Sequence, residues 1–310
     1  MNLKEFLWVE KYRPRKIDDC ILSDSLKEFF NKMIKDGEVQ NLLLTGSAGC
    51  GKTTVAKALC EEIETDYLMI NGSEDNGIDV LRNLIRNFAS SVSLSGKTKI
   101  VIIDEADHLN PTSFQPAFRG FIEEFSKNCR FILTCNNESR IIKPLHSRLI
   151  NVNFTLKKEE KPKIAKLFHG RLIDILTSES IEFDKTVIAM AIQKYFPDFR
   201  KLINEIQRNC INGKLVSTFL SEKVSEIDDL VEYVKNKEWG LMRKWVVDHA
   251  DSDVNSIYSS FYESVIDRTD QKPSLVVLLS KYQYQAAFAI DQSINLTAFL
   301  TEVMSEVEIS

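Results

Sequence analysis

The sequence predicts an α/β fold with a parallel sheet in its first half, followed by helices alone. The pattern G-x-x-x-x-G-K-[ST] occupies residues 46–53 directly after a short apolar run, and such a loop joins a buried strand to a helix. Apolar runs typical of strands then alternate with helical patterns as far as residue 155, which indicates parallel strands. No convincing strand pattern follows Lys157. We therefore expect a five-stranded parallel sheet flanked by helices, and then two helical regions.

The glycine-rich loop is the most informative segment of the chain. Its three glycines let the backbone curl so that several N–H groups point at one anion, at the positive end of the helix that follows. We expect Lys52 to reach the β- and γ-phosphates of a nucleotide, and the Thr53 hydroxyl to bind a magnesium ion. The residues expected to line the phosphates are Gly46, Ser47, Ala48, Gly49, Cys50, Gly51, Lys52, Thr53 and Thr54. The alternative is an ordinary glycine-rich turn.

The other elements follow in order along the chain. Besides the apolar run at 42–44, we expect strands at residues 67–71, 99–104, 130–134 and 150–154. A capped amphipathic helix should begin at Ser23 and end near Gly37, and helices should follow at residues 78–94, 112–126, 159–177, 184–195 and 199–211. Helical patterns continue beyond Ser221, where the net charge changes sharply. We therefore expect three domains, at residues 1–155, 156–221 and 222–310.

Composition and charge narrow the classes of function. An apolar fraction of 44% and a charged fraction of 27% are typical of a soluble globular protein. The chain has no apolar run of eighteen residues and its first five residues do not begin a secretory signal, so we expect a cytosolic protein that contacts no membrane. The net charge is −5, divided as −1 over residues 1–150, +4 over 151–220 and −8 over 221–310. Any contact with nucleic acid therefore requires a local basic patch.

The six cysteines show no C-x-x-C pair and no ligand spacing with the four histidines. We expect free thiols, most of them buried. Cys50 is the exception, because it lies inside the phosphate loop, where we expect it to be open to modification.

Two adjacent carboxylates follow the apolar strand at 99–104. Asp104 is expected to hold the magnesium ion opposite Thr53, and Glu105 to orient the water that attacks the phosphate. An acidic helix cap is the alternative for this pair, and a cap or surface position is expected for Asp107. Asn136 follows the strand at 130–134, where its amide would lie beside the γ-phosphate, although a turn role fits it equally.

Seven segments resemble the AAA+ ATPases, and among them the subunits of sliding-clamp loaders. They are WVEKYRP at 8–14, GSAGCGKTT at 46–54, NGSEDNGIDVLRN at 71–83, IVIIDEAD at 100–107, TCNN at 134–137, IIKPLHSR at 141–148 and FPDFRK at 196–201. NGSEDNGID and IIKPLHSR are specific to clamp loaders, and NGS with FPDFRK resembles the large subunit of T4-like phage loaders, in the replication factor C small-subunit family. The chain length is similar as well.

The resemblance implies a role for several residues that spacing alone leaves unassigned. Val9, Tyr12 and Arg13 would contact the adenine end of ATP, and Asn136 would be the first sensor of the γ-phosphate. Arg200 would be a second sensor on a helical lid, residues 156–221. Arg148 would be an arginine finger that acts in trans on ATP held by a neighbouring subunit. From their positions alone, Arg148 and Arg200 could equally be surface residues.

The resemblance also implies partners. Residues 222–310 would be a helical collar that joins this chain to other copies of itself and to a small clamp-loader subunit. The ring would act on a sliding clamp and on primer–template DNA, in the bacterial host cytoplasm if the protein is a phage protein. Arg82 and Arg119 are candidate DNA contacts, with a solvated helix charge as the alternative. Phe88 and Leu94 are candidates for the clamp surface, with core packing favoured for Phe88.

Three positions differ from the usual family pattern. Leu149 follows the finger arginine where cysteine is usual, and the phosphate loop reads GSAGCGKT where GPPGTGKT is commoner. Asn76 stands where many relatives carry a basic residue that holds the catalytic glutamate inactive until DNA binds, which argues against that form of gating. The main hypothesis is therefore a DNA- and clamp-stimulated ATPase. The alternatives are another AAA+ remodeller of DNA and a nucleotide-binding structural subunit without hydrolysis.

Overall fold

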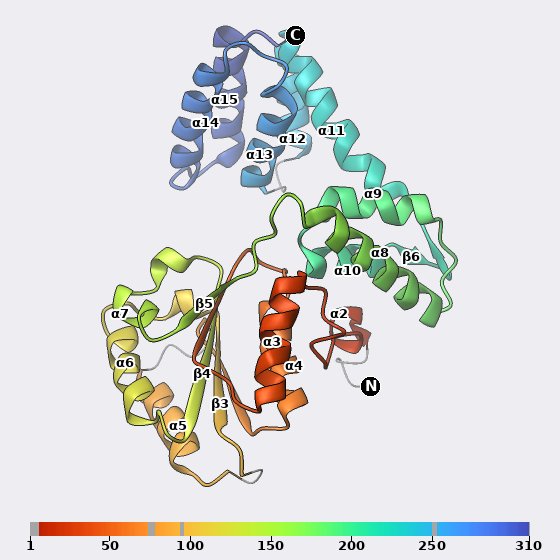
Figure 1. Ribbon diagram of the computed structural model, residues 1–310. Helices are drawn as coiled ribbons and strands as arrows, with labels where there is room; N and C mark the ends of the chain where they lie inside the picture. The colour runs from red at the N-terminus through yellow and green to blue at the C-terminus, as the bar shows by residue number, and fades with distance from the viewer. Residues whose placement is uncertain (1–5, 74–77, 94–95, 250–252, 310) are drawn as a thin grey trace. The chain divides into compact units, whose positions relative to one another are not determined.

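The computed structural model describes residues 6–73, 78–93, 96–249 and 253–309 (Figure 1). The chain forms two compact units, Met1–Val216 and Ser217–Ser310. The division of the chain into domains at residues 1–155, 156–221 and 222–310 stays a prediction. Within the described residues, no helix is long and apolar enough to cross a lipid bilayer.

The first unit contains the expected parallel sheet, with five strands in the order β2-β3-β4-β1-β5. The strands are β1 (Leu42–Thr45), β2 (Tyr67–Asn71), β3 (Lys99–Asp104), β4 (Cys129–Cys135) and β5 (Ile150–Asn153), which confirms all five predicted runs. This order places β4 between β3 and β1. The carboxyl ends of these three strands, which carry the carboxylates, the amide and the phosphate loop, therefore lie side by side, where parallel sheets bind ligands.

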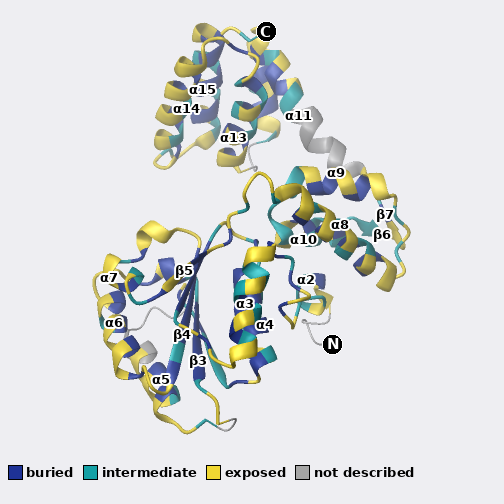
Figure 2. Cartoon of the chain, viewed as in Figure 1, coloured by how far each residue is buried: buried dark blue, intermediate teal, exposed yellow. Residues whose placement is uncertain are grey.

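Helices cover both faces of the sheet (Figure 1). Because successive side chains of a strand point to opposite faces, Leu43 packs in one apolar cluster while Leu42 and Leu44 pack in another. The first cluster includes side chains from α5 (Ile78–Ser90), α6 (Phe114–Glu124) and α7 (Lys143–His146). The second includes side chains from α3 (Asp24–Asp36) and α4 (Lys52–Ile63). The central strands β3, β4 and β1 are buried on both faces, whereas the edge strand β5 is mostly exposed (Figure 2).

Helix α5 is shorter than predicted, because it ends at Ser90 and not at residue 94. The amine of Lys99 donates a hydrogen bond to the Phe88 carbonyl at 2.7 Å and also contacts the Ser91 carbonyl. These carbonyls lie at the end of the helix and have no further helical partner, so a buried ammonium group satisfies them. Lys99 itself is 3% exposed.

Near the N-terminus the first unit has the short helix α2 (Trp8–Lys11). After the sheet it continues with α8 (Lys161–Ser178), α9 (Lys185–Tyr195), α10 (Phe199–Arg208) and a short hairpin. The expectation of no strand beyond Lys157 was wrong, because β6 (Cys210–Ile211) pairs antiparallel with β7 (Lys214–Leu215). Asn212 and Gly213 form the turn with φ of 51° and 77°. Asn-Gly is a strong hairpin signal, and it ends the helix predicted to reach residue 211.

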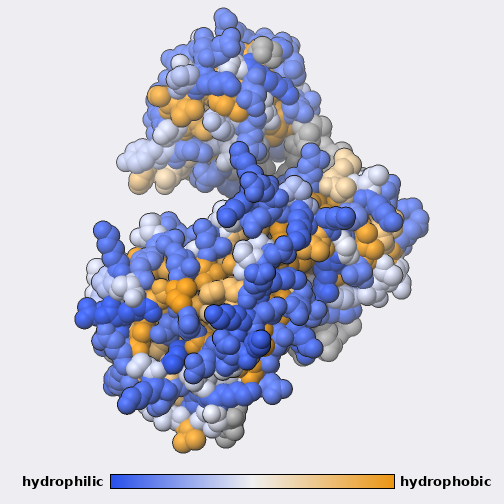
Figure 3. Space-filling view, viewed as in Figure 1, coloured by the Kyte–Doolittle hydropathy of each residue, from blue (hydrophilic) through white to orange (hydrophobic). Residues whose placement is uncertain are grey.

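The second unit is entirely helical in its described residues. Its helices are α11 (Thr218–Lys235), α12 (Trp239–Asp248), α13 (Val254–Val265), α14 (Lys272–Ala286) and α15 (Gln292–Glu306). Tyr258 and Phe299 pack edge to face in its core, with ring centroids 5.0 Å apart, and the buried Asn295 amide donates to the Tyr258 hydroxyl at 2.9 Å. Large apolar side chains also lie on its surface, including Val277, Phe288 and Ile290, and Figure 3 shows apolar groups on this unit among hydrophilic ones.

Candidate nucleotide-binding site

The phosphate loop joins β1 to α4 at the carboxyl edge of the sheet. Gly46, Gly49 and Gly51 all have positive φ, at 149°, 73° and 98°. Gly51 is the N-cap of α4, and no side chain caps that helix end. The first N–H groups of α4 are therefore available to an anion.

Lys52 lies in the centre of the site and is 7% exposed. Its amine donates to the carbonyl oxygens of Gly46 and Ser47, each at 2.8 Å, and to the Asn136 side-chain oxygen at 3.0 Å. A buried ammonium group is thus held between the phosphate loop and the end of β4. This position suits a cation that is to meet phosphate oxygens.

The end of β3 faces the start of α4. The Thr53 hydroxyl donates to Asp104 Oδ1 at 2.7 Å, and the Thr134 hydroxyl donates to the same oxygen at 2.5 Å. The Glu105 N–H donates to Thr134 Oγ1 at 3.1 Å, and Glu105 has a positive φ of 54°. A hydroxyl and a carboxylate so close together are a donor set that suits Mg²⁺.

Asp107 is buried, which corrects the expectation of a cap or surface residue. Its Oδ2 accepts hydrogen bonds from the backbone N–H groups of Asn136 and Asn137, at 3.2 and 3.0 Å, while Oδ1 has no partner. Asp107 therefore fixes the turn that presents the Asn136 amide to Lys52. Its position three residues after Asp104 was visible in the sequence, but the turn that it holds was not.

The N-terminal segment lines the same pocket through Val9, Tyr12 and Arg13. Arg13 forms an ion pair with Glu10 and lies 3.4 Å from the Thr54 hydroxyl. Burial raises the pKa of Glu10, but the hydrogen bond and charge of Arg13, with the charges of Lys57 and Arg200, lower it overall. The Tyr12 hydroxyl donates to Glu179 at 2.7 Å.

The helices after residue 156 supply the remaining wall of the pocket. Arg200 lies in the first turn of α10 and is exposed at the pocket wall. Phe168 and Arg171 of α8 also line the pocket, and Arg171 donates to the Tyr12 carbonyl at 3.0 Å. The sequence patterns did not identify these two residues, because one face of a helix carries no local motif that names its partners. Their spacing of three residues was the available signal.

The pocket thus brings together most of the residues that were predicted to bind or act on the nucleotide. Those that line it are Val9, Tyr12, Arg13, Ala48, Gly49, Cys50, Gly51, Lys52, Thr53, Thr54, Asp104, Glu105, Asn136 and Arg200. Gly46 and Ser47 lie outside its lining, although their carbonyls contact Lys52. Uncapped N–H groups, a buried ammonium and the Thr53–Asp104 pair fit a magnesium-bound triphosphate.

Arg148 does not line this pocket. It is partly buried after α7 and pairs with Glu123 of α6 at 2.6 Å. The hydrogen bond from Arg148, and then its charge, lower the pKa of Glu123. Arg148 also donates to the Pro144 carbonyl at 2.8 Å.

The other candidate contacts lie on the helices of the same unit. Arg82 on α5 and Arg119 on α6 are exposed and outside the pocket. Phe88 on α5 is half-buried and packs against the core, which confirms the core packing that was favoured for it. Leu94 and Asn76 lie outside the described residues.

All six cysteines are free, and five are buried. Cys50 is among the buried ones, so the expectation that it is open to modification was wrong. Burial raises the pKa of its thiol, while the nearby charge of Lys52 opposes that shift. In the part of the chain that the structure describes, no group of three or more His, Cys, Asp or Glu side chains could hold a metal ion.

Comparison with known proteins identifies the family. The model of the "ATPase family associated with various cellular activities (AAA)" matches residues 42–156, and that of the "Rad17 P-loop domain" matches residues 2–74. The solved RuvB Holliday junction branch migration motor of Thermotoga maritima has the same fold, with a TM-score of 0.51 and 18% identity over 73% of this chain and 80% of that one.

Curated relatives are more similar in sequence. The sliding-clamp-loader large subunit of Escherichia phage RB69 is 37% identical over 86% of this chain and 85% of its own, and that of Enterobacteria phage T4 is 40% identical over 77% and 76%. The replication factor C small subunit of Sulfurisphaera tokodaii is 31% identical over 97% and 95%. The chain therefore belongs to the sliding-clamp-loader large-subunit family of AAA ATPases, with the replication factor C small subunits as relatives.

Proposed function

We propose that this chain is an ATPase subunit of a sliding-clamp loader in DNA replication. The observation that carries the proposal is the convergence of Lys52, Asp104 and Asn136 on one pocket, in a chain related to clamp-loader subunits. ATP binding would assemble the loader on the clamp and on primer–template DNA. Hydrolysis would then release the closed clamp on the DNA. For a phage protein, the site of action is the cytoplasm of the bacterial host.

The residues of the pocket divide the work on ATP. Val9, Tyr12 and Arg13 hold the adenine end, and the N–H groups of residues 46–54 hold the phosphates together with Lys52. Thr53 and Asp104 hold a magnesium ion, which supplies charge compensation to the phosphates. This donor pair is supported by their 2.7 Å hydrogen bond.

Three further groups act on the reaction itself. Glu105 orients the attacking water from its place beside Asp104 at the end of β3. Asn136, hydrogen-bonded to Lys52 at 3.0 Å, senses the γ-phosphate. Arg200 reaches the phosphates from α10, so that binding of ATP draws the lid helices onto the phosphate loop. Each group acts by position and charge and forms no covalent bond to substrate.

A complete site needs a second subunit. Arg148 lies outside the pocket of its own chain, and we assign it as a finger that completes the site of a neighbouring copy. The loader would contain other copies of this chain and a small subunit. The apolar side chains exposed on Ser217–Ser310 support this unit as the collar that joins them. Arg82 and Arg119 are the candidate contacts to the DNA backbone.

Steady-state ATP hydrolysis tests this proposal. Turnover by the chain, with its small partner subunit, is measured with and without primer–template DNA and sliding clamp, for the wild type and for Arg148→Ala and Glu105→Gln. We expect strong joint stimulation by DNA and clamp that Arg148→Ala abolishes. Glu105→Gln should keep ATP binding and lose turnover by about two to three orders of magnitude, as when other transition-state groups are removed.

The same experiment can reject the proposal. Turnover indifferent to both DNA and clamp would leave an AAA ATPase with another substrate. Near-normal hydrolysis by Glu105→Gln would remove Glu105 from its role. Absence of hydrolysis under every condition, with ATP binding intact, would favour a structural subunit.

A further inference from the structure

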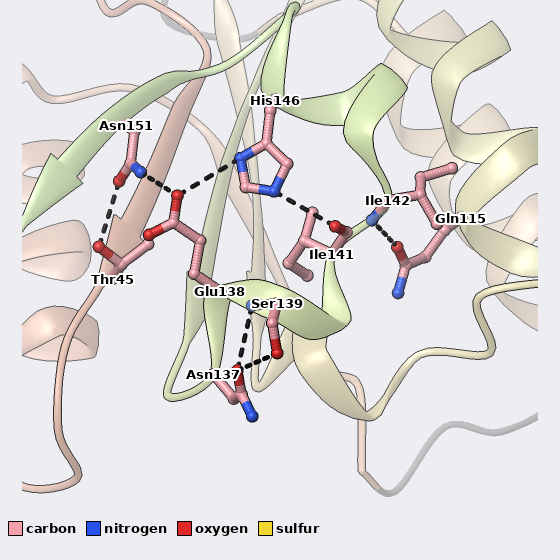
Figure 4. A network of polar contacts seen from close by, with 9 residues as sticks. All are labelled: Thr45, Gln115, Asn137, Glu138, Ser139, Ile141, Ile142, His146 and Asn151. Atoms are coloured by element: carbon pink, nitrogen blue, oxygen red, sulfur yellow. Dashed lines mark hydrogen bonds and ion pairs between the residues drawn. The ribbon is translucent and has the colours of Figure 1, made fainter.

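A small polar network links the phosphate-loop strand to the segment that carries Arg148 (Figure 4). We call its four side chains, Thr45, Glu138, His146 and Asn151, the Glu138 junction. Thr45 ends β1, Glu138 begins the short helix η2 (Glu138–Arg140), His146 ends α7, and Asn151 lies in β5. The junction therefore joins β1 to three consecutive elements that lie about a hundred residues later in the chain.

Glu138 is the centre of the junction (Figure 4). Its Oε1 accepts a hydrogen bond from the Asn151 amide at 2.5 Å, and His146 Nδ1 lies 3.6 Å from the same oxygen. The Asn151 oxygen in turn accepts from the Thr45 hydroxyl at 3.1 Å. His146 Nε2 lies 3.2 Å from the Ile141 carbonyl, so both ring nitrogens have polar neighbours.

One side of the junction adjoins the partners of Lys52. Thr45, 4% exposed, immediately precedes Gly46, whose carbonyl accepts from Lys52. Glu138 lies two residues after Asn136, whose side chain accepts from the same amine. A phosphate bound by the Lys52 amine would displace at least one of its acceptors, because an ammonium group has only three N–H donors and all three are used by Gly46, Ser47 and Asn136. Each released group is covalently close to a member of the junction.

The other side of the junction brackets Arg148. His146 lies two residues before it and Asn151 three residues after it, and both contact Glu138. Helix α7 has only four residues, so it cannot hold this segment rigidly by its own hydrogen bonds. The backbone ladder between β5 and β1 holds the chain after Arg148, and the contacts to Glu138 add side-chain links from this segment to the turn after β4.

We propose that Glu138 is a positioning residue, which sets the place of Arg148 according to whether the phosphate loop of its own chain holds ATP. This inference rests on the proposed function, in which Arg148 completes the neighbouring site. The Glu138 and His146 side chains are 47% and 28% exposed. Because contacts at such exposure add little to stability, removal of Glu138 should loosen the finger segment without unfolding the chain.

The test measures kcat of the assembled loader, stimulated by DNA and clamp, and the Kd of the isolated chain for ATP. Glu138→Ala and Glu138→Gln are each made in the wild-type chain and in Arg148→Ala. We expect Glu138→Ala to lower kcat about fivefold, a typical size for a residue that couples two sites, with the Kd for ATP unchanged. Glu138→Gln should restore most of the activity, because its amide oxygen still accepts from Asn151.

The variants made in Arg148→Ala test whether Glu138 acts through Arg148. If Glu138 works through the finger, its removal causes no further loss of single-turnover rate once Arg148 is gone, since the two changes then remove one effect. Glu124→Ala is the matched control. Glu124 is 48% exposed and lies 3.3 Å from Arg86, so this variant removes a similar surface acid outside the junction, and it should leave kcat unchanged.

Three results would overturn the inference. They are an unchanged kcat in Glu138→Ala, a loss of equal size with and without Arg148, and a loss of similar size in Glu124→Ala. If Arg148→Ala alone left stimulated turnover intact, the finger assignment would fail and the inference with it. That outcome differs from the first three, which leave the proposed function standing.

Discussion

Asp107 offers a direct test of how the site is held together. Its carboxylate, 7% exposed, accepts the N–H groups of Asn136 and Asn137 at 3.2 and 3.0 Å. Removing the acceptor in Asp107→Ala leaves both N–H groups without a partner in the protein. We expect the turn after β4 to open more often, and the Asn136 amide to spend less time at Lys52.

The size of this effect follows from the two bonds. A hydrogen bond to a charged group contributes about 1.5–3 kcal/mol, and the lower end applies here because the turn is open to water, which can replace the lost acceptor. Because two such bonds are lost, Asp107→Ala should lower the free energy of local opening by about 3 kcal/mol, which corresponds to roughly 150-fold faster amide exchange. Asp107→Asn keeps one acceptor oxygen and should lose about half of that energy.

Hydrogen exchange followed by mass spectrometry on a peptide that spans residues 134–140 measures the opening. Stimulated ATP turnover, measured on the same variants, should fall in the same order, with Asp107→Ala below Asp107→Asn. The reasoning is refuted if the peptide exchanges at the wild-type rate in Asp107→Ala. It is also refuted if exchange rises equally in peptides from α3, because that result would indicate general destabilisation.

Three further predictions concern stability and reactivity. Asp198 is the N-cap of α10, and its Oδ1 accepts from the Lys201 N–H at 2.9 Å. A Cβ at Gly49, where φ is 73°, would lie 1.8 Å from that oxygen. Gly49→Ala should therefore lower the free energy of unfolding by about 2 kcal/mol and weaken ATP binding, as measured by urea unfolding and ATP titration. Gly51→Ala, with positive φ but no atom within 4 Å, is its control and should cost about half as much. Lys99→Met should destabilise the chain by about 2 kcal/mol, since the end of α5 loses a buried charged donor; an unchanged urea midpoint would contradict this. Burial raises the pKa of Cys60 from 9.0 to about 12, so its stabilising effect is complete below pH 9 and is lost as the pH rises through 12. Alkylation of Cys60 by iodoacetamide at pH 8 should accordingly be far slower in the folded chain than in urea, and equal rates would contradict its burial.

The sequence was sufficient to predict the sheet and the phosphate loop. Both depend on local patterns: apolar runs of strand length, and glycines at positions that require positive φ, as at Gly49 and Gly51. The strand order explains why Asp104 and Asn136 lie beside Lys52, because the carboxyl ends of β3, β4 and β1 are neighbours in the sheet. These contacts follow from topology once the strands are known to be parallel.

The parts that the sequence did not reveal depend on tertiary contacts. Phe168 and Arg171 enter the pocket because α8 packs beside the N-terminal segment, and helical spacing alone does not say what an apolar face meets. Asp107 was assigned to a cap or to the surface because acidic residues after a strand are usually exposed. Only the folded turn brings two N–H groups to its carboxylate, and that contact makes burial of the charge tolerable.

Arg148 shows why a motif and a structure of one chain give different information. Its place in IIKPLHSR assigns it by resemblance to a finger, while the structure pairs it with Glu123 of the same chain at 2.6 Å. The two are compatible, because the Glu123 carboxylate is 57% exposed and solvent screens an exposed pair strongly. A phosphate on a neighbouring subunit, with more charge and less water around it, can therefore replace Glu123 as the partner of Arg148. On this reasoning Glu123→Gln should leave stimulated turnover intact, whereas the loss of Arg148 should abolish it.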